Sequence, residues 1–282
     1  MKQSDIDLNY VIELSKQGFT QTEVASKIGC VYQDIQRLLK NSEHKITWNK
    51  NHKIKKDEFF FETIDSEIKA YLLGFLYADG NIDKTQGRIT LCIQEDDIYV
   101  ANLFKDFIAP GSFMKIIHNT AGAKNRKPQV FLRINSIKIV NDLKNHGLCP
   151  RKTYETLNFP SIPENMYSHF IRGYFDGDGC VMKSASKKDV YYNKVIFCIN
   201  WKPFLDKMCE IFYSIGIDSI FTKKMKGKTV DWYNLCLWSQ ENNALFANFI
   251  YNDANYYLER KKSKFLFQNT EVTIEPKISI AP

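Results

Sequence analysis

The sequence lacks the features of a membrane, secreted or zinc-ribbon protein. No apolar run among its 282 residues is long enough to span a bilayer, and the opening Met1-Lys-Gln-Ser-Asp does not begin a signal peptide. Its seven cysteines include no Cys-x-x-Cys pair, and their odd number argues against a complete disulfide framework. These absences predict a protein with no membrane partner in a reducing setting inside the cell: the cytoplasm, the nucleoid or an organelle.

The composition is that of an ordinary globular protein with an excess of positive charge. Hydrophobic residues make up 44% of the chain and charged residues 25%, so its 282 residues can form one large or two modest cores. The formal net charge of +7 favours a polyanionic partner such as nucleic acid. Charge alone is weak evidence for such a partner.

Two similar stretches, 72–80 and 171–179, indicate an internal repeat. Each is an apolar run that contains a glycine and ends in Asp-Gly, with Asp79 and Asp178 as the acidic residues. Each stretch, taken with the roughly 90 residues after it, reads as helix, two strands, helix, two strands, helix. The sequence therefore predicts an α+β fold built from a pseudo-two-fold pair of repeats, 65–160 and 161–267, with a tail at 268–282.

Both stretches have the apolar spacing of an α-helix. In the first, the residues that recur at helical intervals are Ile68, Leu72, Phe75 and Leu76. Glycine destabilises the interior of an isolated helix, so Gly74 and Gly173 need a reason to be there. Two helices that cross closely supply one, because glycine lets their backbones approach.

The ends of these two helices are the candidate chemical site. Gly80 and Gly179 are predicted to end them in the left-handed conformation that favours glycine. The crossing would hold the carboxylates of Asp79 and Asp178 together, and paired carboxylates with helix-end carbonyls suit a divalent cation. The alternative is two buried helices whose terminal acids are there by chance.

The first 45 residues read as a small domain of three short helices. Gly18 is predicted to end the first helix, Thr20-Gln-Thr-Glu23 has the form of a capping box, and Gly29 forms the next turn. Two short helices joined through a glycine turn are typical of the helix-turn-helix motif. In that motif the third helix would lie in the major groove of DNA and present Tyr32, Gln33, Gln36 and Arg37. The alternative is a domain that docks onto the rest of the chain and contacts no nucleic acid.

A basic linker, 46–64, comes next in the chain. Its lysines, of which Lys53, Lys55 and Lys56 lie close together, are predicted to follow DNA phosphates. A solvated linker without ordered contacts is the alternative.

Strands in both repeats alternate between apolar and polar residues. The segments 88–94, 113–117 and 129–135 are predicted strands of the first repeat, and 192–200, 217–224 and 232–238 are predicted strands of the second. One face of each sheet would then carry the candidate base-contacting residues Arg88, Thr90, Gln129, Arg133, Asn135, Lys194, Trp232 and Asn234. A face that contacts only water is the alternative for each strand alone.

The two stretches resemble the signature of the LAGLIDADG homing endonuclease family, here of the monomeric, two-motif type with an added helix-turn-helix domain. The resemblance covers about residues 65–267. It implies a DNA-binding saddle that straddles double-stranded DNA and hydrolyses phosphodiester bonds with Mg²⁺ or a similar divalent cation. Asp79 and Asp178 would be the metal ligands, and the Ala78 and Gly177 carbonyls supplementary ones.

The resemblance also implies further catalytic residues. Gln94 and Asn200 match the polar position at the end of the second strand of each repeat. Lys152 and Lys261 match the lysine that follows the fourth strand and the next helix, with Lys262 as an alternative to Lys261. Such a lysine would stabilise phosphate charge or tune the attacking water.

Two departures put equal activity of the two sites in doubt: Asn200 is shorter than the usual glutamine, and Tyr77 stands where the second stretch has Asp176. The leading interpretation is a site-specific double-strand DNA endonuclease that acts as a monomer. A non-cleaving DNA-binding regulator on the same fold and an RNA-binding intron maturase are the alternatives. An intein origin is disfavoured, because the chain starts with Met and ends Ile-Ala-Pro.

Overall fold

The computed structural model describes residues 6–17, 19–42, 46, 48, 56–83, 85–118, 127–185 and 191–265, with the backbone alone for 183–185 and 191–193. The described chain forms two compact units. One unit lies within Met1–Glu58 and Thr90–Ile134, and the other within Phe59–Ile89 and Asn135–Pro282. The predictions for Gly18, Lys53, Lys55 and the tail at 268–282 lie outside the described residues.

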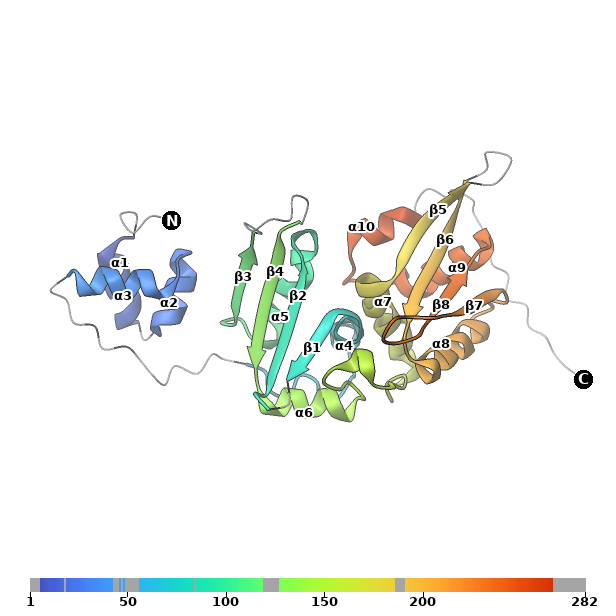
Figure 1. The fold of residues 1–282 in the computed structure, drawn as a ribbon, viewed down its shortest axis with the longest axis horizontal. Coiled ribbons are helices and arrows are strands. Elements are labelled where there is room, and N and C mark those ends of the chain that lie inside the picture. Colours follow the sequence, from blue (N-terminus) through green and yellow to red (C-terminus); the bar gives the residue numbers. More distant parts are fainter. Residues whose placement is uncertain are drawn as a thin grey trace, which may run out of the picture. The chain divides into compact units, whose positions relative to one another are not determined.

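The first part of the chain contains the three predicted helices, α1 (Leu8–Lys16), α2 (Gln21–Ile28) and α3 (Tyr32–Lys40) (Figure 1). The predicted capping box is confirmed: the Thr20 side chain accepts from the Glu23 amide, and the Glu23 carboxylate accepts from the Thr20 amide. Gly29 ends α2 at φ +79°, the left-handed conformation that the turn requires. Val11, Val24 and Ile35 are fully buried and form the centre of a small core.

The two stretches form the helices α4 (Glu67–Asp79) and α7 (Tyr167–Asp178), which lie side by side (Figure 1). The predicted close crossing is confirmed. A Cβ added to Gly74 would lie 2.0 Å from the carbonyl oxygen of Phe170, and one added to Gly173 would lie 2.0 Å from that of Tyr71. Only glycine allows this approach, and neighbouring elements bury almost all of α4.

The predicted conformation of Gly80 and Gly179 is wrong. Their φ angles are −72° and −71°, so both are extended and lead directly into strands. Glycine is needed for another reason, because the chain folds back over the last helical turn. A Cβ on Gly80 would lie 2.6 Å from the Leu76 side chain, and one on Gly179 would lie 2.1 Å from the Phe175 ring.

Two four-stranded sheets share the same plan. The strands are β1 (Gly80–Asp83), β2 (Arg88–Gln94), β3 (Phe113–Ile117), β4 (Gln129–Asn135), β5 (Cys180–Ala185), β6 (Tyr191–Ile199), β7 (Ile220–Met225) and β8 (Trp232–Leu237). Their orders are β1-β2-β4-β3 and β5-β6-β8-β7. The pairs β3–β4, β5–β6, β6–β8 and β7–β8 are antiparallel. The equivalent strand orders confirm the predicted internal repeat and the α+β fold.

The strands β2, β4 and β6 alternate between buried and accessible residues as predicted, whereas β7 and β8 do not. In β4, Val130, Leu132 and Ile134 are buried, and the residues between them are accessible. The helices that complete the repeats are α5 (Ile98–Ile108), α6 (Ile137–Asn145), α8 (Lys202–Ser214) and α9 (Gln240–Tyr251). In the second unit, α8 and α9 pack against β6, and the core between them contains the stacked rings of Tyr174 and Phe197.

The last described segment is less helical than predicted. Between 256 and 265, where the described residues end, the chain contains only α10 (Glu259–Lys262) and the 3-10 turn η5 (Ser263–Phe265). The backbone amides of Tyr256 and Leu258 donate to the carboxylates of Glu67 and Asp176 on the two motif helices. These bonds hold the chain in a non-helical course until Glu259.

Candidate active site at the ends of two crossed helices

The structure brings Asp79 and Asp178 to one place. They are the last residues of α4 and α7, and both side chains are exposed. A Cβ added to Gly177, the residue before Asp178, would lie 3.3 Å from the Asp79 carboxylate. The surrounding protein desolvates the Asp178 carboxylate and raises its pKa, although the ammonium groups of Lys152 and Lys261 act to lower it.

Lys152 binds the end of α4. Its Nζ donates to the carbonyls of Leu76 at 2.8 Å and Tyr77 at 2.6 Å, and also to that of Ala78. The last carbonyls of a helix have no partners within the helix and carry partial negative charge, so an ammonium group is favourable there. Burial lowers the pKa of Lys152 to about 8, although the nearby carboxylates of Asp178 and Asp79 act to raise it.

Lys261 binds the end of α7 in the equivalent way. Its Nζ donates to the Phe175 carbonyl at 3.1 Å and to that of Gly179. Lys261 is only 5% exposed, whereas most lysines in proteins lie on the surface. Lys262 points elsewhere, over the ring of Tyr257 at 3.9 Å. The structure thus places Lys261, and not Lys262, at the helix end.

Tyr77 and Asp176, the position at which the two stretches differ, have equivalent structural roles. The Tyr77 hydroxyl donates to the His146 carbonyl at 2.6 Å, on the chain that leads to Lys152. The Asp176 carboxylate accepts from the Leu258 amide at 2.7 Å, on the chain that leads to Lys261. Each side chain therefore ties its motif helix to the segment that carries a lysine.

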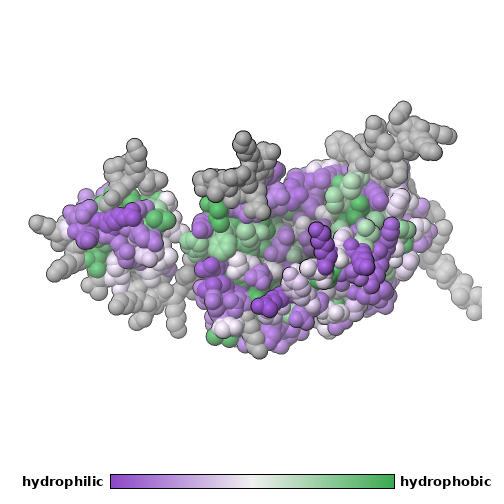
Figure 2. Space-filling view, in the orientation of Figure 1, coloured by the Kyte–Doolittle hydropathy of each residue, from purple (hydrophilic) through white to green (hydrophobic). Residues whose placement is uncertain are grey.

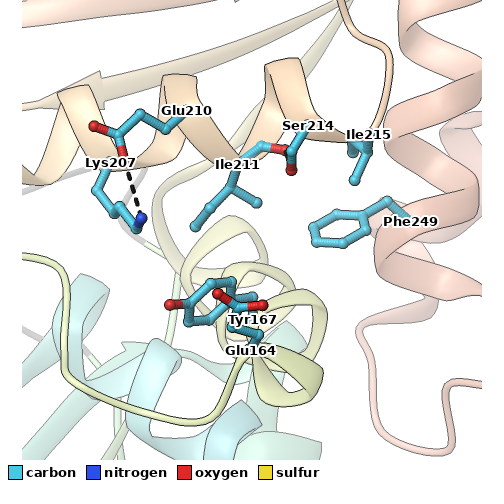
Figure 3. Close-up of a pocket in the computed structure, with 8 residues that line it drawn as sticks. All are labelled: Glu164, Tyr167, Lys207, Glu210, Ile211, Ser214, Ile215 and Phe249. Carbon is cyan, nitrogen blue, oxygen red and sulfur yellow. Dashed lines mark hydrogen bonds and ion pairs between the residues drawn. The ribbon is translucent and has the colours of Figure 1, made fainter. Parts of the chain in front are cut away.

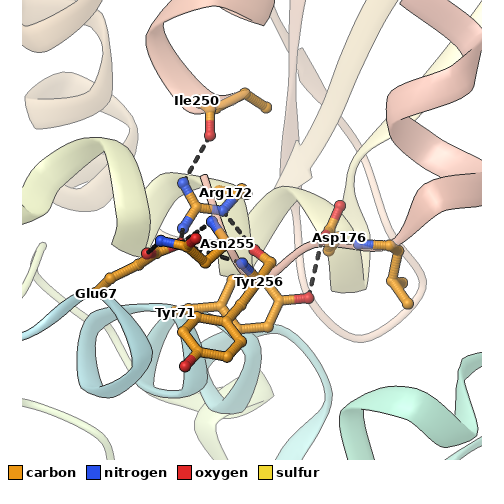
Figure 4. A network of polar contacts seen from close by, with 8 residues as sticks. Glu67, Tyr71, Arg172, Asp176, Ile250, Asn255 and Tyr256 are labelled. Carbon is orange, nitrogen blue, oxygen red and sulfur yellow. Dashed lines mark hydrogen bonds and ion pairs between the residues drawn. The ribbon is translucent and has the colours of Figure 1, made fainter. Parts of the chain in front are cut away.

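A buried polar network on the same helices escaped the sequence analysis (Figure 4). Arg172 in α7 is fully buried and donates to the Glu67 carboxylate of α4 and to the Ile250 carbonyl, each at 2.7 Å. Asp176 accepts from the Tyr71 hydroxyl at 2.9 Å, and burial raises the pKa of this carboxyl to about 6. The only sequence signal was a charged residue inside an apolar helical run.

The polar residues of the first sheet lie on its accessible face. In β2, Thr90 is partly exposed, and Cys92 and Gln94 are exposed. The Cys92 thiol donates to the Gln129 side chain at 3.8 Å. Arg133 lies over the Phe131 ring at 5.1 Å, and its Nε has no hydrogen-bond partner among the described residues. Gln94 belongs to the other compact unit, so its assignment to the candidate site stays a prediction.

Arg88 and Asn135 form a pair at the start of β2 and the end of β4. The Arg88 Nε donates to the Asn135 side chain at 3.1 Å, so each side chain already has a polar partner on the protein.

The second sheet has an equivalent accessible face. Asn234 accepts from the Cys198 thiol at 3.4 Å, while Asn200 and Trp232 are partly exposed. Lys194 lies over the exposed Trp238 ring at 3.7 Å. Figure 2 shows hydrophobic residues within a mostly hydrophilic surface over β3–β4 and over β5–β6.

The sequence analysis missed several residues of this second face. They are Phe221, Lys223 and Trp238. The register of β7 against β8 places the first two, and the contacts of Trp238 with Phe221 and Lys194 place the third.

The candidate DNA contacts of α3 are all accessible. Tyr32, Gln33, Gln36 and Arg37 are exposed, and Arg37 forms an ion pair with Asp34 at 3.4 Å. Lys56 is partly exposed and lies 4.0 Å from the Glu58 carboxylate.

A pocket of about 440 Å³ lies elsewhere in the second unit, between the start of α7 and the helices α8 and α9 (Figure 3). None of the predicted site residues lines it. Its lining consists of Glu164, Tyr167, Lys207, Glu210, Ile211, Ser214, Ile215 and Phe249.

Residues 165–251, from the start of α7 to the end of α9, match a protein family described as LAGLIDADG-like domain. The second repeat is a LAGLIDADG-like domain. This LAGLIDADG-like domain contains Asp178, whereas Lys261 follows it in the chain. Among the described helices, none is both long and apolar enough to cross a membrane.

The chain is also similar to other proteins. It is 25% identical over 192 residues to the uncharacterized protein MJ0314 of Methanocaldococcus jannaschii, a match that covers 67% of this chain and 70% of the relative. The homing endonuclease I-WcaI bound to its DNA recognition sequence is 16% identical, with a TM-score of 0.46, over 73% of this chain and 88% of that one. I-DmoI in complex with DNA and Ca is 16% identical, with a TM-score of 0.45, over 72% of this chain and 98% of that one.

The N-terminal LAGLIDADG domain of DUF199/WhiA is 15% identical, with a TM-score of 0.38, over 69% of this chain and 89% of that one. Similar structures thus include both homing endonucleases and WhiA.

Proposed function

We propose that the protein is a site-specific endonuclease of double-stranded DNA that depends on a divalent cation. The observation that carries the proposal is the pair of exposed carboxylates, Asp79 and Asp178, at the ends of two crossed helices. A carboxylate at the negative end of a helix is unfavourable, and a bound cation would offset the repulsion between two of them. The LAGLIDADG-like domain, which contains Asp178, supports this function.

The donor set fits magnesium. Mg²⁺ is usually held by one or two carboxylates together with water and substrate phosphates. Within the described residues, no cluster of three or more His, Cys, Asp or Glu side chains could hold a metal ion, which argues against an all-protein cage. The Ala78 carbonyl already accepts from Lys152, so we propose Asp79 and Asp178 as the principal ligands, with Gly177 and Ala78 as supplementary ones.

Each protein group would have a defined role in hydrolysis. A bound cation would supply Lewis-acid chemistry toward the phosphodiester. Asp79 and Asp178 would hold it, and the ammonium groups of Lys152 and Lys261 would stabilise the negative charge that develops on the phosphate. The lowered pKa of Lys152, about 8, also lets this lysine exchange a proton near neutral pH. Asn200 would contribute a side-chain amide beside Asp178, in the half of the site that belongs to the second repeat.

The accessible faces of the two sheets are the proposed DNA-reading surfaces. Both carry side-chain amides, Gln129 and Asn234, on the central strands β4 and β8. Amide groups can read base edges in the major groove, where each base pair has its own donor and acceptor pattern. Arg133 fits such a role, because it is partly exposed on β4 and its guanidinium group can donate to base edges. The exposed residues of α3 would add a second contact with duplex DNA.

The test is cleavage of a randomised duplex DNA library with Mg²⁺, followed by sequencing of the cut ends. We expect one recurrent target sequence, no cutting in the presence of EDTA, and loss of cutting but not of binding in Asp178→Asn. The matched control is Asp206→Asn, which changes an exposed carboxylate of α8 that pairs with Lys202.

The other outcomes identify the alternatives. Sequence-specific binding without cleavage would overturn the nuclease proposal in favour of a DNA-binding regulator. Binding confined to structured RNA would favour a maturase.

A further inference from the structure

Lys152 lies on a segment with little regular structure. Between α6 and the turn η4 (Glu164–Met166), the chain forms only the short turn η3 (Lys152–Tyr154). The preceding residue, Arg151, has φ +56°, in the left-handed region that residues with a side chain rarely adopt. Such a conformation persists only where the surrounding contacts hold it. The position of Lys152 therefore needs support from elsewhere in the fold.

Trp201 supplies one such contact. Its indole Nε1–H donates to the backbone carbonyl of Lys152 at 2.9 Å. The indole is 5% exposed and packs edge-to-face against the rings of Tyr77 at 6.2 Å and Phe204 at 5.6 Å. Because the ring is enclosed, its N–H donor is fixed in space, and so is the carbonyl that it binds.

The two ends of Lys152 are thus held by different repeats. Trp201 lies between β6 and α8 of the second repeat and binds the Lys152 backbone. The ammonium group binds the end of α4 in the first repeat, including the Tyr77 carbonyl. Tyr77 takes part in both contacts, since its ring packs on the indole and its carbonyl accepts from the ammonium group.

Lys261 is held in another way. The Leu258 amide, three residues earlier in the chain, donates to Asp176 of α7, within the same repeat. The first-repeat equivalent of Trp201 is Glu95, which directly follows Gln94, and its carboxylate has no N–H to donate. The indole donor of Trp201 therefore has no counterpart at the equivalent position of the first repeat.

We propose that Trp201 is a positioning residue for Lys152, so that the second repeat completes the half-site of the first. This inference rests on the proposed function, in which Lys152 acts at the phosphate. In that function, each carboxylate and its lysine would form one half-site that hydrolyses one DNA strand. Loss of the indole N–H should therefore affect one strand and spare the other.

The first test needs no DNA. Trp201→Phe keeps an aromatic ring at this position and removes the indole N–H. Lys152 is then acetylated with an N-hydroxysuccinimide ester, and the rate, measured by mass spectrometry, reports how firmly the lysine is held. We expect acetylation to be about fivefold faster than in the wild type, the factor that corresponds to one hydrogen bond. Trp238→Phe is the matched control and should leave the rate for Lys152 unchanged, since Trp238 contacts Lys194 and Phe221 instead. An unchanged rate in Trp201→Phe would overturn the inference.

The second test uses the duplex recovered from the cleavage selection, labelled on each strand in turn. Trp201→Phe should slow one strand about fivefold, and the same strand should be the one slowed by Lys152→Met. Equal slowing of both strands would overturn the inference. If the wild type cuts no duplex, the proposed function fails and the acetylation result still decides the role of Trp201.

Thermal unfolding accompanies both tests. If Trp201→Phe does not fold, benzothienylalanine at position 201 keeps the shape of the indole and removes only the N–H donor.

Discussion

Replacing Gly74 with alanine tests whether the close crossing of α4 and α7 holds the candidate site together. The new Cβ would lie 2.0 Å from the Phe170 carbonyl oxygen, whereas contacts below 3.0 Å essentially never occur, so the helices must separate by roughly 1 Å. The obstacle is backbone, so no side chain can rotate away. Alanine favours a helix over glycine by about 1 kcal/mol. Overpacking of a core typically costs about 1–3 kcal/mol. Because backbone atoms block the new Cβ, we take the upper end and expect a net loss of stability of about 2 kcal/mol.

The assay is urea unfolding followed by circular dichroism. Gly216→Ala is the matched control. Its φ of +89° strains any side chain, but the nearest atom, in the Leu245 side chain, would lie 3.9 Å from the new Cβ, so only the conformational cost of about 1 kcal/mol applies. We expect Gly74→Ala to unfold at a lower urea concentration than both the wild type and Gly216→Ala. An unchanged or raised midpoint for Gly74→Ala would refute the role of the glycine contact.

Three further predictions concern other parts of the molecule. Arg172→Met should lower the free energy of unfolding, measured by urea titration, by about 3 kcal/mol, because it leaves the buried Ile250 carbonyl without its donor. An unchanged free energy of unfolding would contradict the importance of the network. Burial lowers the pKa of His169 below 6.5, so the unfolded state takes up the proton first and stability falls as the pH drops below that value; His169→Gln should flatten this decline in pH-dependent unfolding. Deletion of residues 1–45 should weaken duplex binding far more than the cleavage rate of bound DNA, and equal affinity in gel-shift titrations would leave α3 without the proposed contact.

Local signals were enough to predict most elements of the fold. The alternation of Val130, Leu132 and Ile134 predicted β4, and Thr20 with Glu23 predicted the start of α2. These patterns arise within a few residues, so the sequence displays them directly.

Contacts between distant segments were harder to predict. Arg172 and Glu67 are separated by 105 positions, and no local pattern links them. The need for glycine at position 80 was predicted, but for the wrong reason. A left-handed helix end and close contact with the Leu76 side chain both require glycine, and the sequence does not distinguish them. The positions of Lys152 and Lys261 followed from the family resemblance alone, since each reaches a helix end that lies far away in the sequence.

The Arg172 network has a consequence for biosynthesis. Arg172 and Asp176 lie inside the protein, and their partners include backbone groups of Ile250, Tyr256 and Leu258. A nascent chain that has emerged only as far as α8 offers these two side chains their α4 partners, Glu67 and Tyr71, but not the later backbone groups. Packing of α7 on α4 should therefore be incomplete during early translation. Full assembly of the carboxylate pair should therefore wait until residue 258 has left the ribosome, and a prematurely terminated product should be prone to degradation.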